Sequence, residues 1–352
     1  MHELTFQPWR EHSAATVERA FAHAATSRGQ LEAYKYTKWD KVVALLRPTR
    51  SESPVPCPGI EFRSLSWAHD NAMLAELLDL GIDQQPMLLA GFMQAGEIIY
   101  AQTTADARLN LNALGGNAPV YIDVAPGTRL TCEQRGGAVQ AVYVRARDDA
   151  EVVHARDLSD TDEGWHGLVV DIHADASYTL HNFATGGTLQ RQDTLLRARF
   201  EGARARVDSA AYIAEQAHLD QNFTVQHLAP RTISVHRCHN IARHAAKVTF
   251  NGRIYIDRDC PGVEAELNNR NLALDEAATF NTKPELEIYT DDVKCAHGAT
   301  VGQLDADQLF YFLSRGIDRN SARAQLAQAF LRQCINGPQA DDVERKIIQV
   351  LA

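Results

Sequence analysis

The feature that most constrains the fold is an alternation of apolar and charged residues whose phase shifts at a glycine. In the segment LRARFEGARARVD, Leu196, Ala198 and Phe200 alternate with charged residues, and after Gly202 the alternation resumes one residue out of phase at Ala203. Side chains alternate between the two faces of a strand, so the shift predicts a bend at the glycine that returns the apolar row to the same interior. This pattern is typical of a solenoid corner.

A second segment, KVTFNGRIYID, has a similar arrangement around Asn251 and Gly252. Val248 and Phe250 precede this pair, and Ile254 follows it on the face predicted to be inside. Asn-Gly is also a strong signal for a two-residue β-hairpin. The local pattern therefore leaves two interpretations open, a solenoid or a set of ordinary hairpins.

Three regions follow one another along the chain. Residues 1–116 are rich in alanine, leucine and charged residues, with Ser13 as a helix N-cap, and predict a mainly helical region interrupted by the prolines of SESPVPCPG. Residues 117–300 contain short runs such as VYIDV and GLVVDI, rich in β-branched residues, and predict a mostly β core. Residues 301–352 return to helical patterns and predict a small helical domain.

Three short helices are expected in this last region. Asp305 is placed to cap the first, which should end at Gly316, and Ser321 is placed to cap the second. The sequence DDVERKIIQVLA predicts the third. The aromatic run FYF at positions 310–312 cannot face a single apolar stripe, so some aromatic surface is expected to remain for a partner.

Charge and cysteine spacing exclude several classes of protein. The 352 residues include 35 Lys and Arg against 45 Asp and Glu, a formal net charge of -10, so nucleic acid is not an expected partner. No apolar run is long enough to cross a membrane and the first residues lack a secretion signal, which favours a cytoplasmic protein without a membrane partner. Six widely separated cysteines argue against a disulfide framework or a zinc ribbon.

The sequence lacks the short motifs of several common enzyme classes. It contains no GxxxxGK[ST] phosphate-binding loop, no GxGxxG, no HExxH and no GxSxG. Nucleotide hydrolysis, dinucleotide binding and the familiar hydrolase layouts therefore have no motif support. Any step driven by ATP would need another chain.

The stretch DDVKCAH places a cysteine and a histidine two residues apart at the end of a predicted strand. If the backbone stays extended, Cys295 and His297 project to the same side. Thiolate and imidazole together suit iron–sulfur species, copper or zinc, but two ligands do not complete a tetrahedral site. The alternative is structural, with Cys295 as a small buried apolar residue and His297 as a hydrogen-bonded turn residue.

A second cluster, HRCHNIARH, holds His236, Cys238, His239 and His244. The first two share a strand face, but the spacing fits no fixed metal-binding pattern. In a chain with 14 histidines, surface histidines are the favoured interpretation of this cluster.

The segment KPELEIYTDDVKCAHGATVGQLDADQLFYFLSRGI, residues 283–317, closely resembles the SufB/SufD family of the Suf iron–sulfur cluster assembly machinery, and within it the SufD branch. The resemblance extends upstream through NNRNLAL, FNGRIYI and the segment from LRARFEGARARVD to QNFTVQHLAP, and it includes EAYKYT near the N-terminus. It covers most of residues 190–330. Over the first 190 residues it is weaker, and there the chain looks shorter than typical relatives.

The resemblance implies a right-handed parallel β-helix core with an N-terminal helical region and a small C-terminal helical domain. It also implies a scaffold subunit, not an enzyme, that pairs with a SufB-like subunit through the β-helix and binds a SufC-like ABC ATPase through the C-terminal helices. By the same resemblance, His297 is a candidate cluster ligand at the SufB interface, and Cys295 matches the motif's cysteine with a less defined role. The resemblance leaves open whether an isolated chain forms a homodimer. It implies that an isolated chain holds no stable cluster, the iron–sulfur cluster being transient in the complex.

The chain departs from the family pattern at two places. Cys238, His239 and Asn240 stand where a Tyr-Lys-Gly segment is common, so no role is carried over to that region. Ala296 stands where serine is common, a change between two small residues. The cysteine-rich ligand set associated with SufB is not visible, which favours the SufD branch.

Two other functions compete with the scaffold. A β-helix enzyme acting on polysaccharide could use acidic strand residues, namely Glu285, Glu287, Asp291 and Asp292, as acid and base or to bind a cation. A purely structural β-helix with an inert Cys-x-His pair is the third interpretation.

Overall fold

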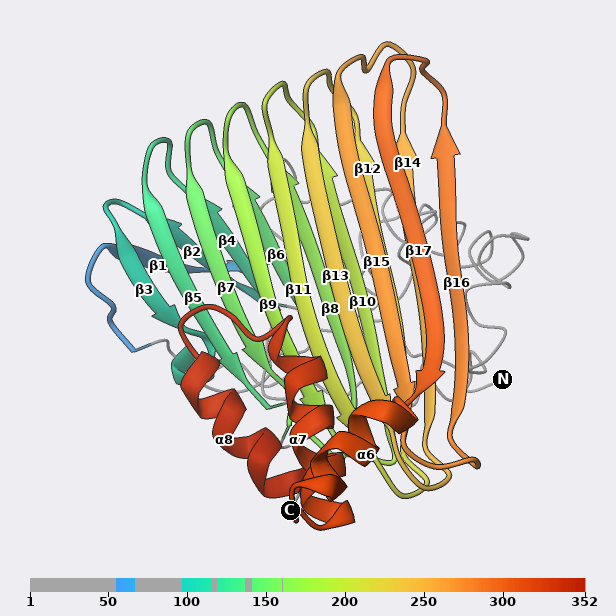
Figure 1. The fold of residues 1–352 in the computed structure, drawn as a ribbon. Coiled ribbons are helices and arrows are strands. Elements are labelled where there is room, and N and C mark those ends of the chain that lie inside the picture. The colour runs from blue at the N-terminus through green and yellow to red at the C-terminus, as the bar shows by residue number, and fades with distance from the viewer. Residues whose placement is uncertain (1–54, 67–96, 115–118, 137–140, 160, 352) are drawn as a thin grey trace, which may run out of the picture.

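The computed structural model describes residues 55–66, 97–114, 119–136, 141–159 and 161–351. In this part of the chain, strands stack into a parallel β-helix, and helices lie against one of its faces near the lower end (Figure 1). The parallel β-helix predicted for the core is confirmed. The helices predicted within residues 1–116 lie outside the described residues, and the division into three regions stays a prediction. The described residues of that range instead form strands at 60–66, 97–103 and 107–110 that belong to the two sheets, so the β core begins before the predicted residue 117.

Two sheets form the walls of the β-helix, and successive strands from β2 onward alternate between them. The nine-stranded sheet contains, in spatial order, β1 (Ile60–Ser66), β2 (Glu97–Thr103), β4 (Val120–Val124), β6 (Ala141–Ala146), β8 (Glu163–Ile172), β10 (Leu189–Ala198), β12 (His218–His227), β14 (Lys247–Ile256) and β16 (Thr279–Ile288). The eight-stranded sheet contains β17 (Val293–Gln303), β15 (Val263–Ala273), β13 (Ile233–Ala242), β11 (Arg204–Ile213), β9 (Ser177–Thr185), β7 (Glu151–Asp157), β5 (Arg129–Arg135) and β3 (Ala107–Asn110). A short 3₁₀ helix, η1 (Leu111–Leu114), follows β3. Strands β1 and β2 pair antiparallel, and the later neighbours within each sheet pair in parallel.

The apolar core lies between the two sheets. In the parallel register, equivalent inward positions of successive strands stack directly on one another. One such stack in the nine-stranded sheet consists of Ile122, Val144, Val170, Leu196, Val225, Ile254 and Leu286. Burying each aliphatic side chain of this size contributes roughly 1.5–3 kcal/mol, so every added coil stabilises the coil beneath it.

The predicted corner at Gly202 is confirmed, because β10 and β11 belong to different sheets. Gly202 has a φ of +74°, and a Cβ atom there would lie 2.2 Å from Oδ1 of Asp175 in the neighbouring turn. Glycine is required at this corner for both reasons. Asp175 itself has a φ of +54°. Its backbone N–H donates to the Glu201 carbonyl at 3.1 Å, so backbone hydrogen bonds join the turns of neighbouring coils as well as their strands.

Phe200 does not point inward as the alternation predicted. Its side chain is 46% exposed, and its ring lies 4.7 Å from that of His173 on the outside of the corner. The strand ends at Ala198, and the alternation of faces ends with it. By contrast, Leu196, Ala198 and Ala203 are buried as predicted.

The pair Asn251-Gly252 forms neither a corner nor a hairpin. Both residues lie inside the continuous strand β14, which pairs in parallel with β12 and β16. A Cβ atom on Gly252 would lie 2.6 Å from Cε1 of Phe250 and 2.6 Å from Cδ1 of Leu267. The glycine therefore makes room for a large ring in the core, and packing overrides the turn propensity of Asn-Gly.

Helices α6 (Ala306–Ser314), α7 (Arg319–Arg332) and α8 (Ala340–Leu351) follow the last strand. The buried face of α7 and α8, which includes Leu331 and Ile347, packs on outward residues of the eight-stranded sheet such as Phe183 and Ile241. At the edge of this contact, Lys346 Nζ lies 2.8 Å from the carboxylate of Asp157. The C-terminal helices thus cover the outer face of one wall of the β-helix.

The first two C-terminal helices begin at aspartates. Asp305 caps α6 as predicted, because its side chain accepts from the backbone N–H groups of Asp307 and Gln308. The second helix begins earlier than predicted. Asp318, not Ser321, is its N-cap, and the Asp318 carboxylate accepts from the N–H of Ser321 itself. Both residues are good caps by type, and the aspartate precedes the serine along the chain.

We expect acid to destabilise the β-helix through its interior histidines. Burial lowers the pKa of His154 and of His227 to about 3 and that of His236 to about 4, against 6.5 for an ordinary histidine. Between pH 6.5 and pH 4, these three histidines are therefore more protonated in the unfolded chain than in the folded chain. The contribution of these neutral histidines to the free energy of unfolding is fully present above pH 6.5. It falls as the pH drops toward 4, by up to about 1.4 kcal/mol per pH unit for each histidine.

His236→Leu tests this expectation, since neither ring nitrogen of His236 has a hydrogen-bond partner among the described residues. Urea unfolding at pH 7 and at pH 5 should show a smaller loss of unfolding free energy in the variant than in the wild type. His244→Asn is the control, because His244 is exposed at a corner with a φ of +55°, which asparagine tolerates. Equal losses in His236→Leu and wild type would refute the assignment.

Candidate functional site

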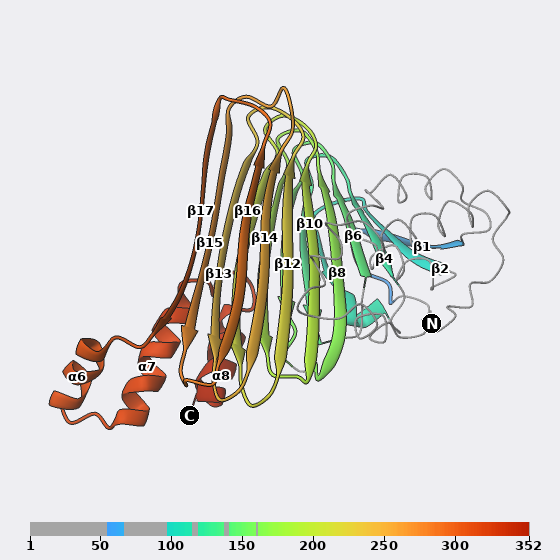
Figure 2. The ribbon, with the colours of Figure 1, turned by 90° about the vertical axis from the view of Figure 1, so that its right-hand side faces the viewer.

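The β-helix is open at the end formed by its last two strands. In each sheet the final strand has one neighbour among the described strands, β14 for β16 and β15 for β17. Figure 2 shows both strands at the flank of the molecule opposite β1 and β2. The backbone N–H and C=O groups along the free edges of β16 and β17 can pair with another strand. We call this last coil, made of β16 and β17, the open end.

Cys295 and His297 lie on β17 and occupy the same face of it. Cys295 is paired in register with Ala265 of β15, and His297 with Leu267. Ala265 and Leu267 are buried core residues, so both side chains of the Cys-x-His pair belong to the inward row of the β-helix. At the open end, no described coil covers this row.

The two side chains differ in exposure. Cys295 is half-buried and packs against the apolar core, and its burial raises the pKa of the thiol although the backbone of Ala265 partly offsets this. A metal ion would have to displace the thiol proton. His297 is exposed. The imidazole is therefore the more accessible donor of the pair.

The described residues alone do not complete a metal site around this pair. Within the described ranges, no three His, Cys, Asp or Glu side chains come together in a way that could hold a metal ion. Iron in a cluster needs further ligands, in most proteins thiolates. Any metal held by Cys295 and His297 would need donors from outside these residues.

Polar residues that the sequence analysis did not single out lie just inside the open end. Asn269 Oδ1 accepts hydrogen bonds from Asn271 Nδ2 at 2.6 Å and from the Thr282 hydroxyl at 2.8 Å. Asn271 also donates to the backbone carbonyl of Thr300 on β17 at 3.0 Å. These bonds join β15, β16 and β17 and hold the last coil in place. Two asparagines on alternate positions of a strand are the only sequence signal for this network.

The HRCHNIARH cluster is largely buried, contrary to the prediction of surface histidines. His236 and Cys238 share the inward face of β13 and are 1% and 0% exposed. His239 faces outward beneath α7, where Nδ1 lies 2.8 Å from the Phe330 carbonyl oxygen. Only His244 lies at the surface, with its Nδ1 3.0 Å from a Glu215 carboxylate oxygen. The strand alternation distributes the cluster to both faces and a corner.

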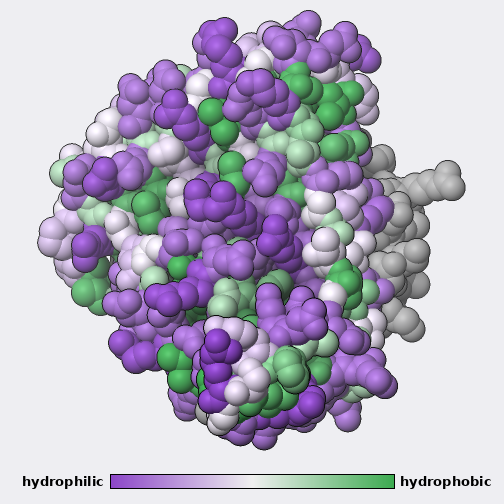
Figure 3. All heavy atoms as spheres, viewed as in Figure 1, coloured by the Kyte–Doolittle hydropathy of each residue, from purple (hydrophilic) through white to green (hydrophobic). Residues whose placement is uncertain are grey.

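Helix α6 presents aromatic residues to solvent, as predicted. Phe310 is 69% exposed and Tyr311 is 54% exposed, and the guanidinium of Arg315 lies 3.6 Å from the centre of the Tyr311 ring. No residue of α6 is buried. Figure 2 shows α6 projecting away from the β-helix, and Figure 3 shows hydrophobic residues at the surface in the lower part of the molecule, where the helices lie.

The described part of the chain contains no helix that is both long and apolar enough to cross a membrane. This finding agrees with the absence of a long apolar run in the sequence.

Comparisons with known proteins agree on one family. A family model described as "SUF system FeS cluster assembly, SufBD core domain" matches residues 120–330. The iron–sulfur cluster assembly protein SufD of Escherichia coli is 30% identical over 174 residues, which cover 49% of this chain and 41% of that protein. An iron–sulfur cluster assembly SufBD family protein of Synechocystis is 31% identical over 193 residues, 54% of this chain and 42% of that protein. SufB of Bacillus subtilis is 32% identical over 131 residues, which cover 37% of this chain and 28% of that protein. The matched region thus spans less than half the length of each of these relatives.

We expect thiol labelling to distinguish the open end from the core. In the folded protein at pH 8, N-ethylmaleimide should modify Cys295 but leave Cys132 and Cys238, which are buried, unmodified until denaturant is added. Because burial raises the pKa of the Cys295 thiol, less of it is thiolate at pH 8, and it should react more slowly than free glutathione. Mass spectrometry of tryptic peptides measures both rates. Equal rates for Cys238 and Cys295 in the folded protein would contradict the interior position of Cys238.

Proposed function

The chain belongs to the SufBD family of the SUF iron–sulfur cluster assembly system, and from this premise we propose that it is a non-catalytic scaffold subunit for cluster assembly. The observation that carries the proposal is the open end, where an unpaired strand edge and the Cys295-x-His297 pair coincide. An edge can be extended by a partner's strand, and an incomplete ligand pair can be completed by a partner's side chains.

The partner that fits the open end is a SufB-like subunit. The relatives of this chain include both SufD and SufB proteins, so a second β-helix of the same family would present an edge of the same kind. Edge-to-edge pairing would satisfy the backbone groups of β16 and β17 and continue the stack of coils. Alone, the chain would satisfy the same edges by pairing with a second copy of itself.

The nascent cluster would form at this junction, with His297 as the ligand from this chain. The imidazole is exposed on the inward row of the last coil, and a neutral imidazole can ligate cluster iron. Cys295 is the secondary candidate, since its half-buried thiol is harder to deprotonate. Because the remaining ligands come from the partner, the isolated chain holds no stable cluster, and the cluster is cargo of the complex.

The C-terminal helices would bind a SufC-like ABC ATPase. The chain has no phosphate-binding loop of its own, so energy from ATP must enter through another protein. Helix α6 offers the contact surface, because Phe310 and Tyr311 are exposed side by side on a helix with no buried residue. Exposed aromatic residues next to an arginine are typical of the energetic centre of an interface.

The polysaccharide enzyme is less well supported. Glu285 lies 2.7 Å from Lys283 Nζ and Glu287 lies 2.5 Å from Arg253 Nη2, so both carboxylates are held in ion pairs along the strands. This arrangement favours a structural role for them on β16.

His297→Ala should strongly reduce cluster assembly without disturbing the complex. The side chain is exposed, so its removal should change the unfolding free energy by no more than about 0.5 kcal/mol. Iron and sulfide per complex, measured after anaerobic reconstitution with the SufB-like and SufC-like partners, should fall about tenfold or more. Co-purification of the three subunits should be unchanged.

Cys295→Ala is the matched variant for this experiment, two residues away on the same strand face. It should reduce iron and sulfide less than His297→Ala does. The opposite order would reverse the ligand assignment, and full cluster content in both variants would make the Cys-x-His pair structural. Persistent stoichiometric iron and sulfide on the isolated wild-type chain would show that no partner ligand is needed.

The double change Phe310→Ser and Tyr311→Ser should weaken binding of the SufC-like ATPase while leaving the fold intact. Neither side chain is buried, so thermal unfolding should match the wild type, whereas loss of two interface aromatics should weaken binding by about 2 kcal/mol or more, roughly thirtyfold in Kd. Isothermal titration calorimetry with the purified ATPase gives the Kd.

Ile348→Ser is the control for this surface, since Ile348 on α8 is 52% exposed. It should leave the Kd unchanged, and an effect as large as that of the α6 double variant would move the contact to α8. Truncation after Thr300 is a poorer test. It would remove the end of β17 and uncover Phe183 and Ile241, which α7 and α8 cover.

A further inference from the structure

Arg156 places a guanidinium group inside the β-helix. It lies on β7, and its side chain is 2% exposed. Nε donates to Oδ1 of Asn182 on the neighbouring strand at 2.8 Å, and Nη2 lies 3.4 Å from the hydroxyl of Thr194 on β10, in the opposite sheet. The side chain therefore reaches across the interior from one wall to the other.

No carboxylate among the described residues balances this charge. Within the described ranges, Arg156 forms no ion pair, and its hydrogen-bond partners are a neutral amide and a hydroxyl. The nearest acidic neighbour along the strand, Asp157, faces outward and pairs with Lys346 at 2.8 Å. Burial lowers the pKa of Arg156 to about 10, which still leaves the guanidinium protonated at neutral pH. A buried charge without a counter-charge costs several kcal/mol, so folded proteins pair such groups.

In the part of the chain that the structure describes, other buried donors around Arg156 also lack acceptors. The Gln192 side chain accepts at Oε1 from Asn182 at 3.1 Å and from Gln221 at 3.3 Å. Its Nε2 group, a donor, has no partner among the described residues. Asn182 therefore bridges Arg156 and Gln192 and holds them close together. His154, two residues before Arg156 on the same face, has Nδ1 2.7 Å from the Tyr178 hydroxyl and no partner at Nε2.

We propose that the interior of the β-helix binds a small monovalent anion, of which chloride is the simplest, between the guanidinium of Arg156 and the Nε2 group of Gln192. The anion neutralises the guanidinium and accepts from donors that otherwise have no acceptor. The surrounding side chains are fully buried and close-packed, which restricts the site to an ion of one or a few atoms. This inference concerns the interior of this chain and does not depend on the proposed scaffold function.

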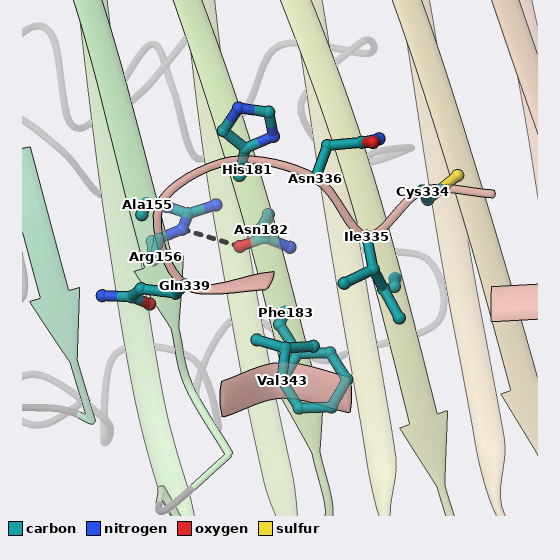
Figure 4. Close-up of a pocket in the computed structure, with 11 residues that line it drawn as sticks. Ala155, Arg156, His181, Asn182, Phe183, Cys334, Ile335, Asn336, Gln339 and Val343 are labelled. Carbon is teal, nitrogen blue, oxygen red and sulfur yellow. Dashed lines mark hydrogen bonds between the residues drawn. The ribbon is translucent and has the colours of Figure 1, made fainter. Parts of the chain in front are cut away.

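A cavity of about 20 Å³ adjoins the site on the outer side of the eight-stranded sheet. Arg156 and Asn182 line it, together with Gln339 and Asn336 from the segment between α7 and α8. Figure 4 shows the hydrogen-bonded Arg156 and Asn182 on their two strands beneath this segment. The volume is enough for one water molecule or small ion.

Thermal unfolding of the full chain at constant ionic strength tests the proposal. Replacing gluconate, which is too large for the site, by chloride should raise the Tm by about 4 °C when chloride reaches one hundred times its Kd. Arg156→Met keeps an unbranched apolar stem and removes the charge, so its Tm should not depend on which anion is present. Arg129→Met is the matched control, because Arg129 is exposed and paired with Glu151 at 2.7 Å. It should respond to chloride as the wild type does.

Bromide gives a direct readout that does not depend on any variant folding. Crystals of the wild-type protein grown in bromide should show an anomalous peak in contact with Arg156 and Gln192. The absence of that peak at saturating bromide would overturn the proposal. An equal chloride effect on the Tm of wild type and Arg156→Met would overturn it as well, since the salt would then act elsewhere.

Discussion

The fold depends on hydrogen bonding between coils, which satisfies each strand from the strands on both of its sides. Strand β15, for example, pairs with β13 on one side and β17 on the other, over ten and eleven residue pairs. A coil in the middle of the stack has its backbone groups satisfied and its inward side chains covered. The last coil has neither on its free side, so its backbone edge and its inward side chains can contact another chain.

The inside of the β-helix combines two kinds of packing. Exchanges between apolar residues of similar volume in such aliphatic stacks usually cost less than about 1.5 kcal/mol. Its polar section around Asn182 is different, because every donor and acceptor there must find a partner within a few ångströms. The side chain of Asn182, for example, forms hydrogen bonds with Arg156, Gln192 and Ser209. That section fixes the pairing of the two walls more strictly than the aliphatic stacks do.

Local sequence patterns predicted those features that depend on neighbours in the chain. The phase shift at Gly202 identified a corner, and the alternation in Cys295-x-His297 placed both residues on one face. Features that depend on contacts between coils were missed. Asn251-Gly252 is a turn signal in any short window, and only the ring of Phe250 beside it explains why the strand continues. The Arg156 cluster draws on strands more than twenty residues apart, which no local pattern links. The resemblance to a known family was needed to choose the solenoid over hairpins and to give His297 a role.

The connection between β17 and α6 has a mechanical consequence. Strand β17 ends at Gln303 and α6 begins at Ala306, so two residues separate the edge strand from the helix. A pull on α6 along the direction of the strand would load all eleven pairs between β17 and β15 in shear at once. A pull at right angles would open them one after another, starting with Gln303 and Ala273 and reaching His297 only after six pairs had parted. The direction of an applied force, more than its size, would decide whether the end of the strand that carries Cys295 and His297 moves.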